Sequence, residues 1–87
     1  MTAQEMFEEL GFKKYLNKYD KEYKKEYGYE VFFRYKNDMT EIAFDCLDMD
    51  YAVYGTIMGR GITVGITMEL HKAINQQCKE LGWLDEW

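Results

Sequence analysis

The clearest hydrophobic pattern along the chain lies near its C-terminus, in residues 67–83. Thr67 is a suitable N-cap, because its hydroxyl can accept a hydrogen bond from a backbone N–H of the first turn. Gly82 can adopt the left-handed conformation that ends a helix, and Trp83 can then pack on the last turn. Gln77 is the polar exception on the apolar side, so we expect it to bond to the sheet backbone or to lie at an interface. The positions that recur at helical spacing predict an amphipathic helix, and they are Leu70, Ala73, Ile74, Gln77, Cys78 and Leu81.

A second helix is predicted at the N-terminus. Thr2 and Glu5 match a capping box, in which each side chain satisfies a free backbone donor of the first turn. Gly11 is placed to end this helix. The apolar residues between them follow one side of a helix, and they are Ala3, Met6, Phe7 and Leu10.

Residues 12–28 are compatible with a helix or with a strand. The aromatic residues keep helical register as far as Tyr27, Asp20 and Lys24 form an i,i+4 pair, and Gly28 can end a helix. We expect a helix whose tyrosines face together and pack inward, with part of the segment extended.

Alternation of apolar and polar residues predicts strands at 29–36, 40–47 and 51–57, and a short fourth strand at 62–66. Asn37-Asp38 suits a tight turn between the first two strands, since both residues tolerate positive φ. The prediction is an α+β fold: a small antiparallel sheet of three to four strands, with the N-terminal helix and the C-terminal amphipathic helix packed on one face.

The length of 87 residues predicts a single domain, residues 1–87. The chain has no apolar run near the roughly 20 residues of a membrane span, and no basic start followed by an apolar core. These features predict no membrane contact and a cytoplasmic location. Cys46 and Cys78 are too few and too far apart for a disulfide framework or a zinc site, so we expect two reduced core thiols.

Charge is unevenly distributed, although the net value is −5. Residues 12–36 are basic, whereas the segments before and after them are acidic. Lysines that alternate with tyrosines in 13–27 can meet phosphates while the aromatic rings stack on bases, which is typical of single-stranded nucleic-acid binding. The candidate nucleic-acid-binding residues are Lys13, Lys14, Lys18, Lys21, Lys24 and Lys25, interleaved with Tyr15, Tyr19, Tyr23 and Tyr27.

Acidic residues gather where the strand at 40–47 ends. Their spacing does not match an EF-hand loop, and we predict no metal site. The alternatives are a solvated acidic turn and an acidic patch that meets a basic partner surface, such as the nucleic-acid channel of a nuclease. The candidate partner-binding residues are Glu41, Asp45, Asp48, Asp50, Tyr51 and Tyr54.

Nothing in the sequence indicates an enzyme. His71 is the only histidine, and no recognisable nucleophile or carboxylate motif accompanies it. Gly59-Arg60-Gly61 matches neither a Walker loop nor a dinucleotide fingerprint, and a hairpin turn explains it. We therefore predict no catalytic residues and no cofactor.

Two segments carry a resemblance to known proteins. MTAQEMFEELGF (1–12) and ITMELHKAINQQCKELGW (66–83) resemble a group of small proteins encoded by phages and prophages of Gram-positive bacteria, and together they cover about a third of the chain. The group is mostly of unknown function, so the resemblance implies a context, a phage product in the bacterial cytoplasm, and no site residues. By analogy, a small phage protein of this kind would bind and inhibit a host or defence factor such as a CRISPR nuclease. The alternative is a nucleic-acid-binding accessory protein that uses residues 13–27.

Overall fold

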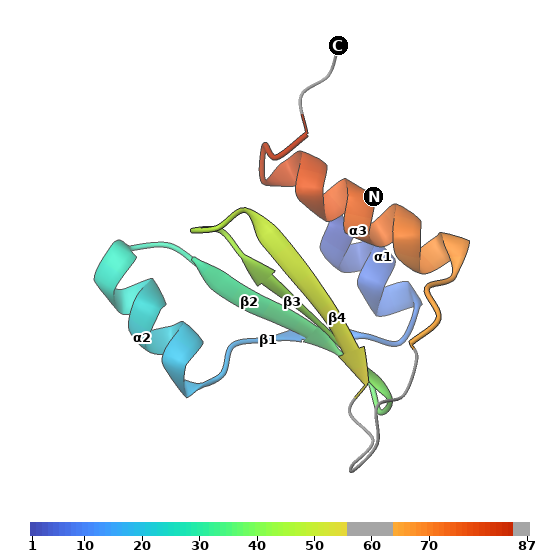
Figure 1. Ribbon diagram of the computed structural model, residues 1–87, viewed down its shortest axis with the longest axis horizontal. Helices are drawn as coiled ribbons and strands as arrows, with labels where there is room; N and C mark the ends of the chain where they lie inside the picture. Colours follow the sequence, from blue (N-terminus) through green and yellow to red (C-terminus); the bar gives the residue numbers. More distant parts are fainter. Residues whose placement is uncertain (56–63, 85–87) are drawn as a thin grey trace.

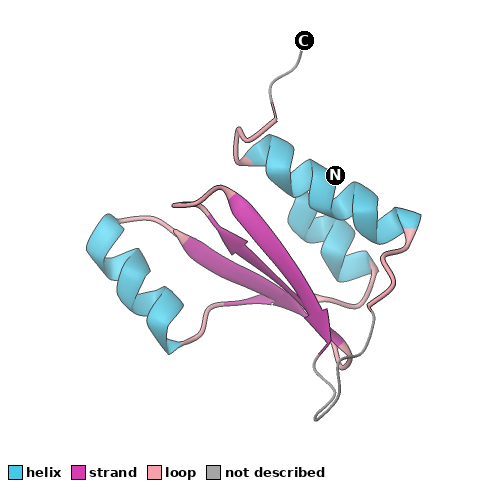
Figure 2. Ribbon diagram, viewed as in Figure 1, coloured by secondary structure: helices cyan, strands magenta, loops and turns pink. Residues whose placement is uncertain are grey.

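The computed structural model describes residues 1–55 and 64–84, which form three helices and four strands. The strands make one antiparallel sheet in the order β1-β2-β3-β4, with α1 and α3 on one face and α2 on the other side (Figures 1 and 2). The predicted α+β fold is confirmed. The elements are α1 (Ala3–Glu9), β1 (Lys13–Tyr15), α2 (Lys18–Tyr27), β2 (Phe32–Lys36), β3 (Thr40–Asp45), β4 (Asp50–Gly55) and α3 (Met68–Glu80).

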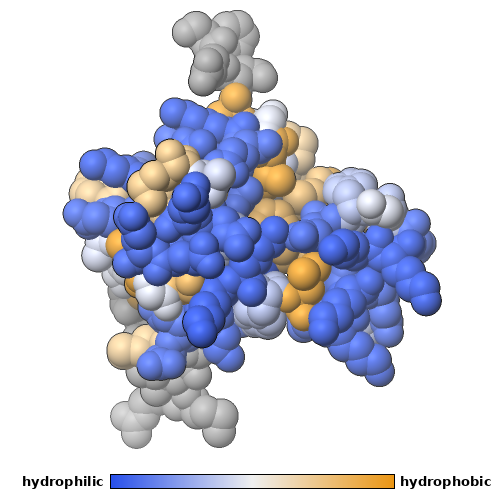
Figure 3. Space-filling model, turned by 180° about the vertical axis from the view of Figure 1, so that it is seen from behind, coloured by the Kyte–Doolittle hydropathy of each residue, from blue (hydrophilic) through white to orange (hydrophobic). Residues whose placement is uncertain are grey.

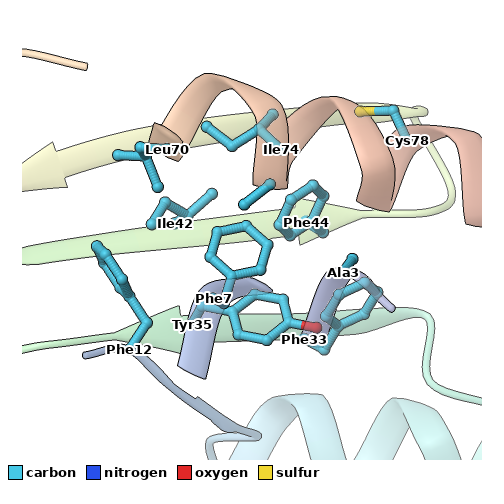
Figure 4. Close-up of a cluster of buried hydrophobic side chains, with 11 residues drawn as sticks. Ala3, Phe7, Phe12, Phe33, Tyr35, Ile42, Phe44, Leu70, Ile74 and Cys78 are labelled. Carbon is cyan, nitrogen blue, oxygen red and sulfur yellow. The ribbon is translucent and has the colours of Figure 1, made fainter. Parts of the chain in front are cut away.

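The hydrophobic core lies between α1, α3 and one face of the sheet. Cross-strand pairing sets Phe33 opposite Phe44, so both rings point to this face, where they stack with centroids 5.1 Å apart. Phe7 of α1 stacks on Tyr35 of β2 at 4.0 Å (Figure 4). The buried cluster is completed by Ala3, Phe12, Ile42, Leu70, Ala73, Ile74 and Cys78.

The predicted N-caps of α1 and α3 and the predicted left-handed residue after α3 are confirmed. The Thr2 hydroxyl accepts a hydrogen bond from the Glu5 amide at 3.2 Å, and the Glu5 carboxylate accepts one from the Thr2 amide at 2.9 Å. The Thr67 hydroxyl accepts from the Leu70 amide at 3.1 Å. Gly82 follows α3 with φ of 75°, as the left-handed prediction requires.

Residues 12–28 divide between a strand and a helix. The side chain of Asn17 accepts from the Asp20 amide at 2.8 Å, and the Asp20 carboxylate accepts from the Asn17 amide at 3.0 Å. This capping box starts α2 at Lys18, so residues 13–15 are left to pair with β2. The expectation that the tyrosines of α2 pack inward is wrong: Asp20 is the buried residue of the helix, and Tyr19 is 70% exposed.

The strand predictions are right in position and differ in their bounds. The strand predicted at 29–36 begins at Phe32, and the one predicted at 40–47 ends at Asp45. Of the predicted fourth strand, residues 62 and 63 lie outside the described residues, and 64–66 form no strand. The sheet gains its remaining strand from β1, the part of residues 12–28 that is extended. The end of the strand predicted at 51–57 and the turn predicted at 58–61 lie outside the described residues. None of the helices that the structure describes is long and apolar enough to cross a bilayer.

Candidate partner-binding surface

The sheet face turned away from α1 and α3, here called the outer face, carries mostly polar side chains. Cross-strand register aligns two rows on it: Lys13, Lys36, Glu41 and Tyr54, and beside them Tyr15, Arg34, Ala43 and Ala52. Seen from behind, most of the described residues at the surface are hydrophilic, and hydrophobic residues show between them (Figure 3).

Glu41 lies in a hydrogen-bonded network at the centre of the outer face. Its carboxylate accepts hydrogen bonds from the hydroxyls of Tyr15 and Tyr54, and Arg34 Nη1 lies 3.4 Å from it. Burial alone would raise the pKa of Glu41, but the two tyrosine hydrogen bonds and the arginine charge hold it below its ordinary value. Burial, with the hydrogen bond to Glu41, raises the pKa of Tyr54.

This network corrects the assignment of Glu41 to a partner-binding acidic patch. Glu41 is only 7% exposed, and each of its carboxylate oxygens accepts a hydrogen bond within the molecule. A partner cannot reach this carboxylate without breaking the network. Tyr54 is 40% exposed, yet its hydroxyl is bound to Glu41 and to Arg34 Nη1 at 2.9 Å. Tyr54 therefore belongs with the outer face.

The three aspartates come together at the turn between β3 and β4. Asp45 and Asp50 are directly opposite each other across the strands. Asp45 Oδ1 accepts from the amides of Leu47 at 2.9 Å and Asp48 at 3.1 Å, which shapes the turn. Among the described residues, none of these three carboxylates forms an ion pair. No cation of the described residues therefore neutralises their negative charge.

Apolar side chains lie beside these aspartates. Leu47 is 46% exposed, Met49 57% and Tyr51 44%. Met49 has φ of 56°, so the turn bends sharply at this residue. Together these residues form what we call the turn surface: Asp45, Leu47, Asp48, Met49, Asp50 and Tyr51. Leu47 and Met49 were not among the residues predicted from the sequence, although their alternation with aspartates in 47–50 was a readable signal.

Tyr51 and Tyr54 point to opposite faces of the sheet. Tyr51 pairs with Phe44 on the helix-covered face, where the ring centroids are 5.8 Å apart. Tyr54 pairs with Glu41 on the outer face. Asp45 and Asp50, which are opposite each other, also lie on the outer face. Tyr51 therefore adjoins the acidic turn in sequence but points to the other face, whereas Tyr54 shares the face of these aspartates but is bound in the Glu41 network farther along β4.

The lysines and tyrosines of α2 lie on separate rows. Lys18, Lys21 and Lys25 recur at i, i+3 and i+7, whereas the tyrosines recur at i, i+4 and i+8 from Tyr19. Tyr23 stacks on the next tyrosine of its row at 6.1 Å and meets Phe32 edge-on at 4.8 Å. Phosphate-binding charges and stacking rings are therefore not interleaved on this helix.

The other candidate lysines are divided between β1, which carries Lys13 and Lys14, and α2, which carries Lys24. Lys14 Nζ lies 2.7 Å from Glu30 and 4.8 Å from the ring centroid of Phe33, so an internal pair occupies it. Lys24 Nζ lies 3.9 Å from the same glutamate. Lys13, the first residue of β1, lies opposite Lys36 in the strand register. The six candidate nucleic-acid residues therefore do not form one groove.

The remaining candidates have structural explanations. The Tyr35 hydroxyl donates a hydrogen bond to Gln77 Oε1 at 2.8 Å, so Gln77 bonds to a side chain of the sheet and not to its backbone. Burial raises the pKa of Cys46 and Cys78, both of which are free thiols. His71 is exposed on α3. Within residues 1–55 and 64–84, no group of three His, Cys, Asp or Glu side chains is placed to hold a metal ion.

Comparisons with known proteins yield no match, whether with protein-family models, with curated proteins or with solved structures.

Proposed function

We propose that this chain is a phage-encoded binding protein that acts in the bacterial cytoplasm and inhibits a host or defence factor, such as a CRISPR nuclease. It acts by contact and not by catalysis. The observation that supports the proposal most is the turn surface, where carboxylates that form no ion pair with any described residue lie beside exposed Leu47, Met49 and Tyr51. Methionine and tyrosine are enriched in the centres of interfaces.

Charge explains why the partner would be basic. Asp45 and Asp50 face each other across the strands, an arrangement that contributes repulsion and no stability to the fold. A basic surface on a partner would relieve this repulsion and speed association. If that surface is the nucleic-acid channel of a nuclease, the bound protein blocks the natural ligand.

The test begins with affinity capture from infected cells, with and without nuclease treatment. We expect one host protein to be retained after nuclease treatment. In Asp45→Asn/Asp48→Asn/Asp50→Asn, the side-chain oxygen at position 45 can still accept the turn amides, so the melting temperature should change little. Association with the partner should slow about tenfold or more, because steering depends on these charges.

A matched control separates local from general charge effects. Glu9→Gln/Glu22→Gln/Glu26→Gln removes the same amount of charge from exposed positions outside the turn surface. It should leave association nearly unchanged. If both triple variants bind as the parent does, the acidic turn is only a solvated turn.

The second candidate function is nucleic-acid binding through α2. It is favoured by one observation: Lys18, Lys21 and Lys25 are exposed and form no ion pair with any described residue. Affinity for labelled nucleic acid should then fall steeply with salt, and neutralising Lys21, Lys24 and Lys25 should flatten the slope. The absence of any mobility shift at low salt would eliminate this function.

A further inference from the structure

The outer face holds a cavity at the end of the sheet opposite to the turn surface. Its volume is about 400 Å³, within the range of small-molecule sites. It lies where β1 begins and β2 ends, beside the β2–β3 turn. The residues that line it are Gly11, Lys13, Tyr15, Lys36, Asn37 and Asp38.

Two lysines face each other at this cavity. Lys13 is directly opposite Lys36 in the pairing of β1 with β2, and both are exposed. Like charges in such a pair repel, since the Cβ atoms of opposite residues are about 5 Å apart. Neither lysine forms an ion pair with any described residue. The pair therefore leaves two positive charges beside an open cavity.

The arrangement of Glu41 explains why Lys36 forms no ion pair with a described carboxylate. Glu41 is opposite Lys36 across β2 and β3, and it would be the natural partner of that ammonium. Its oxygens instead accept hydrogen bonds from Tyr15 and Tyr54, and Arg34 lies beside it. The Glu41 carboxylate, which would otherwise neutralise the lysine pair, is thus already bound within the internal network.

We propose that this cavity binds a phosphate monoester through Lys13 and Lys36. Such a group carries nearly two negative charges at neutral pH, which matches two ammonium groups better than a carboxylate does. Asn37 Oδ1 already accepts from the amides of Met39 and Thr40, so its amide nitrogen is the part of that side chain able to donate to an anion. Tyr15 supplies an aromatic wall for the organic part of the ligand. Asp38 also lines the cavity.

The probe is phenyl phosphate, added to the isotope-labelled full chain at constant ionic strength and followed by amide chemical shifts. We expect saturable shifts confined to the residues around 11–15 and 36–38. Lys13→Met and Lys36→Met should each weaken binding about tenfold, and the double variant should show no saturable shift. Lys21→Met, on α2, should leave binding unchanged. A double lysine variant that binds like the parent overturns the site, as does phenyl sulfate binding as tightly as phenyl phosphate.

Thermal unfolding gives an independent reading. Without ligand, Lys13→Met should raise the melting temperature, because it removes the repulsion from Lys36. Phenyl phosphate should stabilise the parent and add little to the variant. A variant that the ligand stabilises as much as it does the parent contradicts the proposal.

Two sources of the phosphate are distinguished by a third arm. A 5′-phosphorylated oligonucleotide that binds far more tightly than phenyl phosphate, and than its unphosphorylated counterpart, assigns the site to nucleic-acid ends. Equal affinity for the oligonucleotide and phenyl phosphate assigns it to free phosphate esters.

Discussion

Replacing Arg34 with methionine tests how α2 is held against the sheet. Arg34 Nε lies 2.9 Å from Asp20 Oδ2, and Nη2 lies 3.4 Å from Asp20 Oδ1, so the pair is nearly bidentate. Asp20 is only 2% exposed. Methionine keeps most of the aliphatic side chain but removes the charge. It therefore leaves the Asp20 carboxylate buried without its cation, and it also removes the cation beside Glu41.

The expected cost follows from the burial of the two partners. Removing one member of a buried ion pair costs about 3–5 kcal/mol. The Arg34 side chain is 22% exposed, so water screens the pair in part, and we expect about 3 kcal/mol, the low end of that range. This is a large fraction of the roughly 5–15 kcal/mol that stabilises a small domain.

The assay is urea unfolding followed by circular dichroism, with two further variants. Lys24→Met breaks an exposed contact of 3.9 Å with Glu30 and should cost less than about 0.5 kcal/mol. Asp20→Asn/Arg34→Met keeps an acceptor for the Asn17 amide and leaves no unpaired charge at position 20, although Glu41 still loses the neighbouring cation. This double variant should recover more than half of the loss. A cost below about 1 kcal/mol for Arg34→Met, or a double variant no more stable than the single one, would refute the reasoning.

Three other changes have defined outcomes. Gly82→Val should lower the free energy of unfolding by about 1–2 kcal/mol, because a β-branched residue disfavours φ of 75°, and an unchanged melting temperature would contradict this. Tyr35→Phe should cost about 1–2 kcal/mol in urea unfolding, since it leaves the buried Gln77 oxygen without a donor, and adding Gln77→Leu should restore part of it. The folded-state pKa of Glu41 is below its unfolded value of about 4.3, so its contribution to stability is complete above about pH 5 and is lost as pH falls through the folded pKa. Glu41→Gln should therefore reduce the slope of stability against pH below about pH 5.

The parts of the fold that depend on local chemistry could be predicted from the sequence. The Thr67 cap, the Thr2–Glu5 box and the left-handed Gly82 involve residues within a few positions of one another. The burial of α2 could not be predicted in the same way. Its tyrosines keep helical spacing and suggest an apolar side, yet the helix is held by Asp20, whose partner Arg34 lies 14 positions away in another element.

The candidate site, too, could be predicted only where its residues lie close together in the sequence. Asp48 and Asp50 are close in sequence to the turn that exposes them, so the sequence alone predicts that they lie together. The burial of Glu41 depends on three side chains from three other strands, two tyrosines and an arginine, which the register of the sheet brings together. Single-strand alternation predicts the face of Glu41 but not the partners that neutralise it.

The attachment of α2 has a consequence for how the molecule opens. The helix is inserted between β1 and β2, and it contacts the sheet through the Asp20–Arg34 pair and the edge of Tyr23 against Phe32, outside the core formed by α1, α3 and the other face of the sheet. Breaking these contacts exposes little of that core. We therefore expect amide hydrogen exchange to divide the chain into two units, with α2 opening at lower free energy than β2 and β3. High salt, which screens ion pairs, should widen this difference.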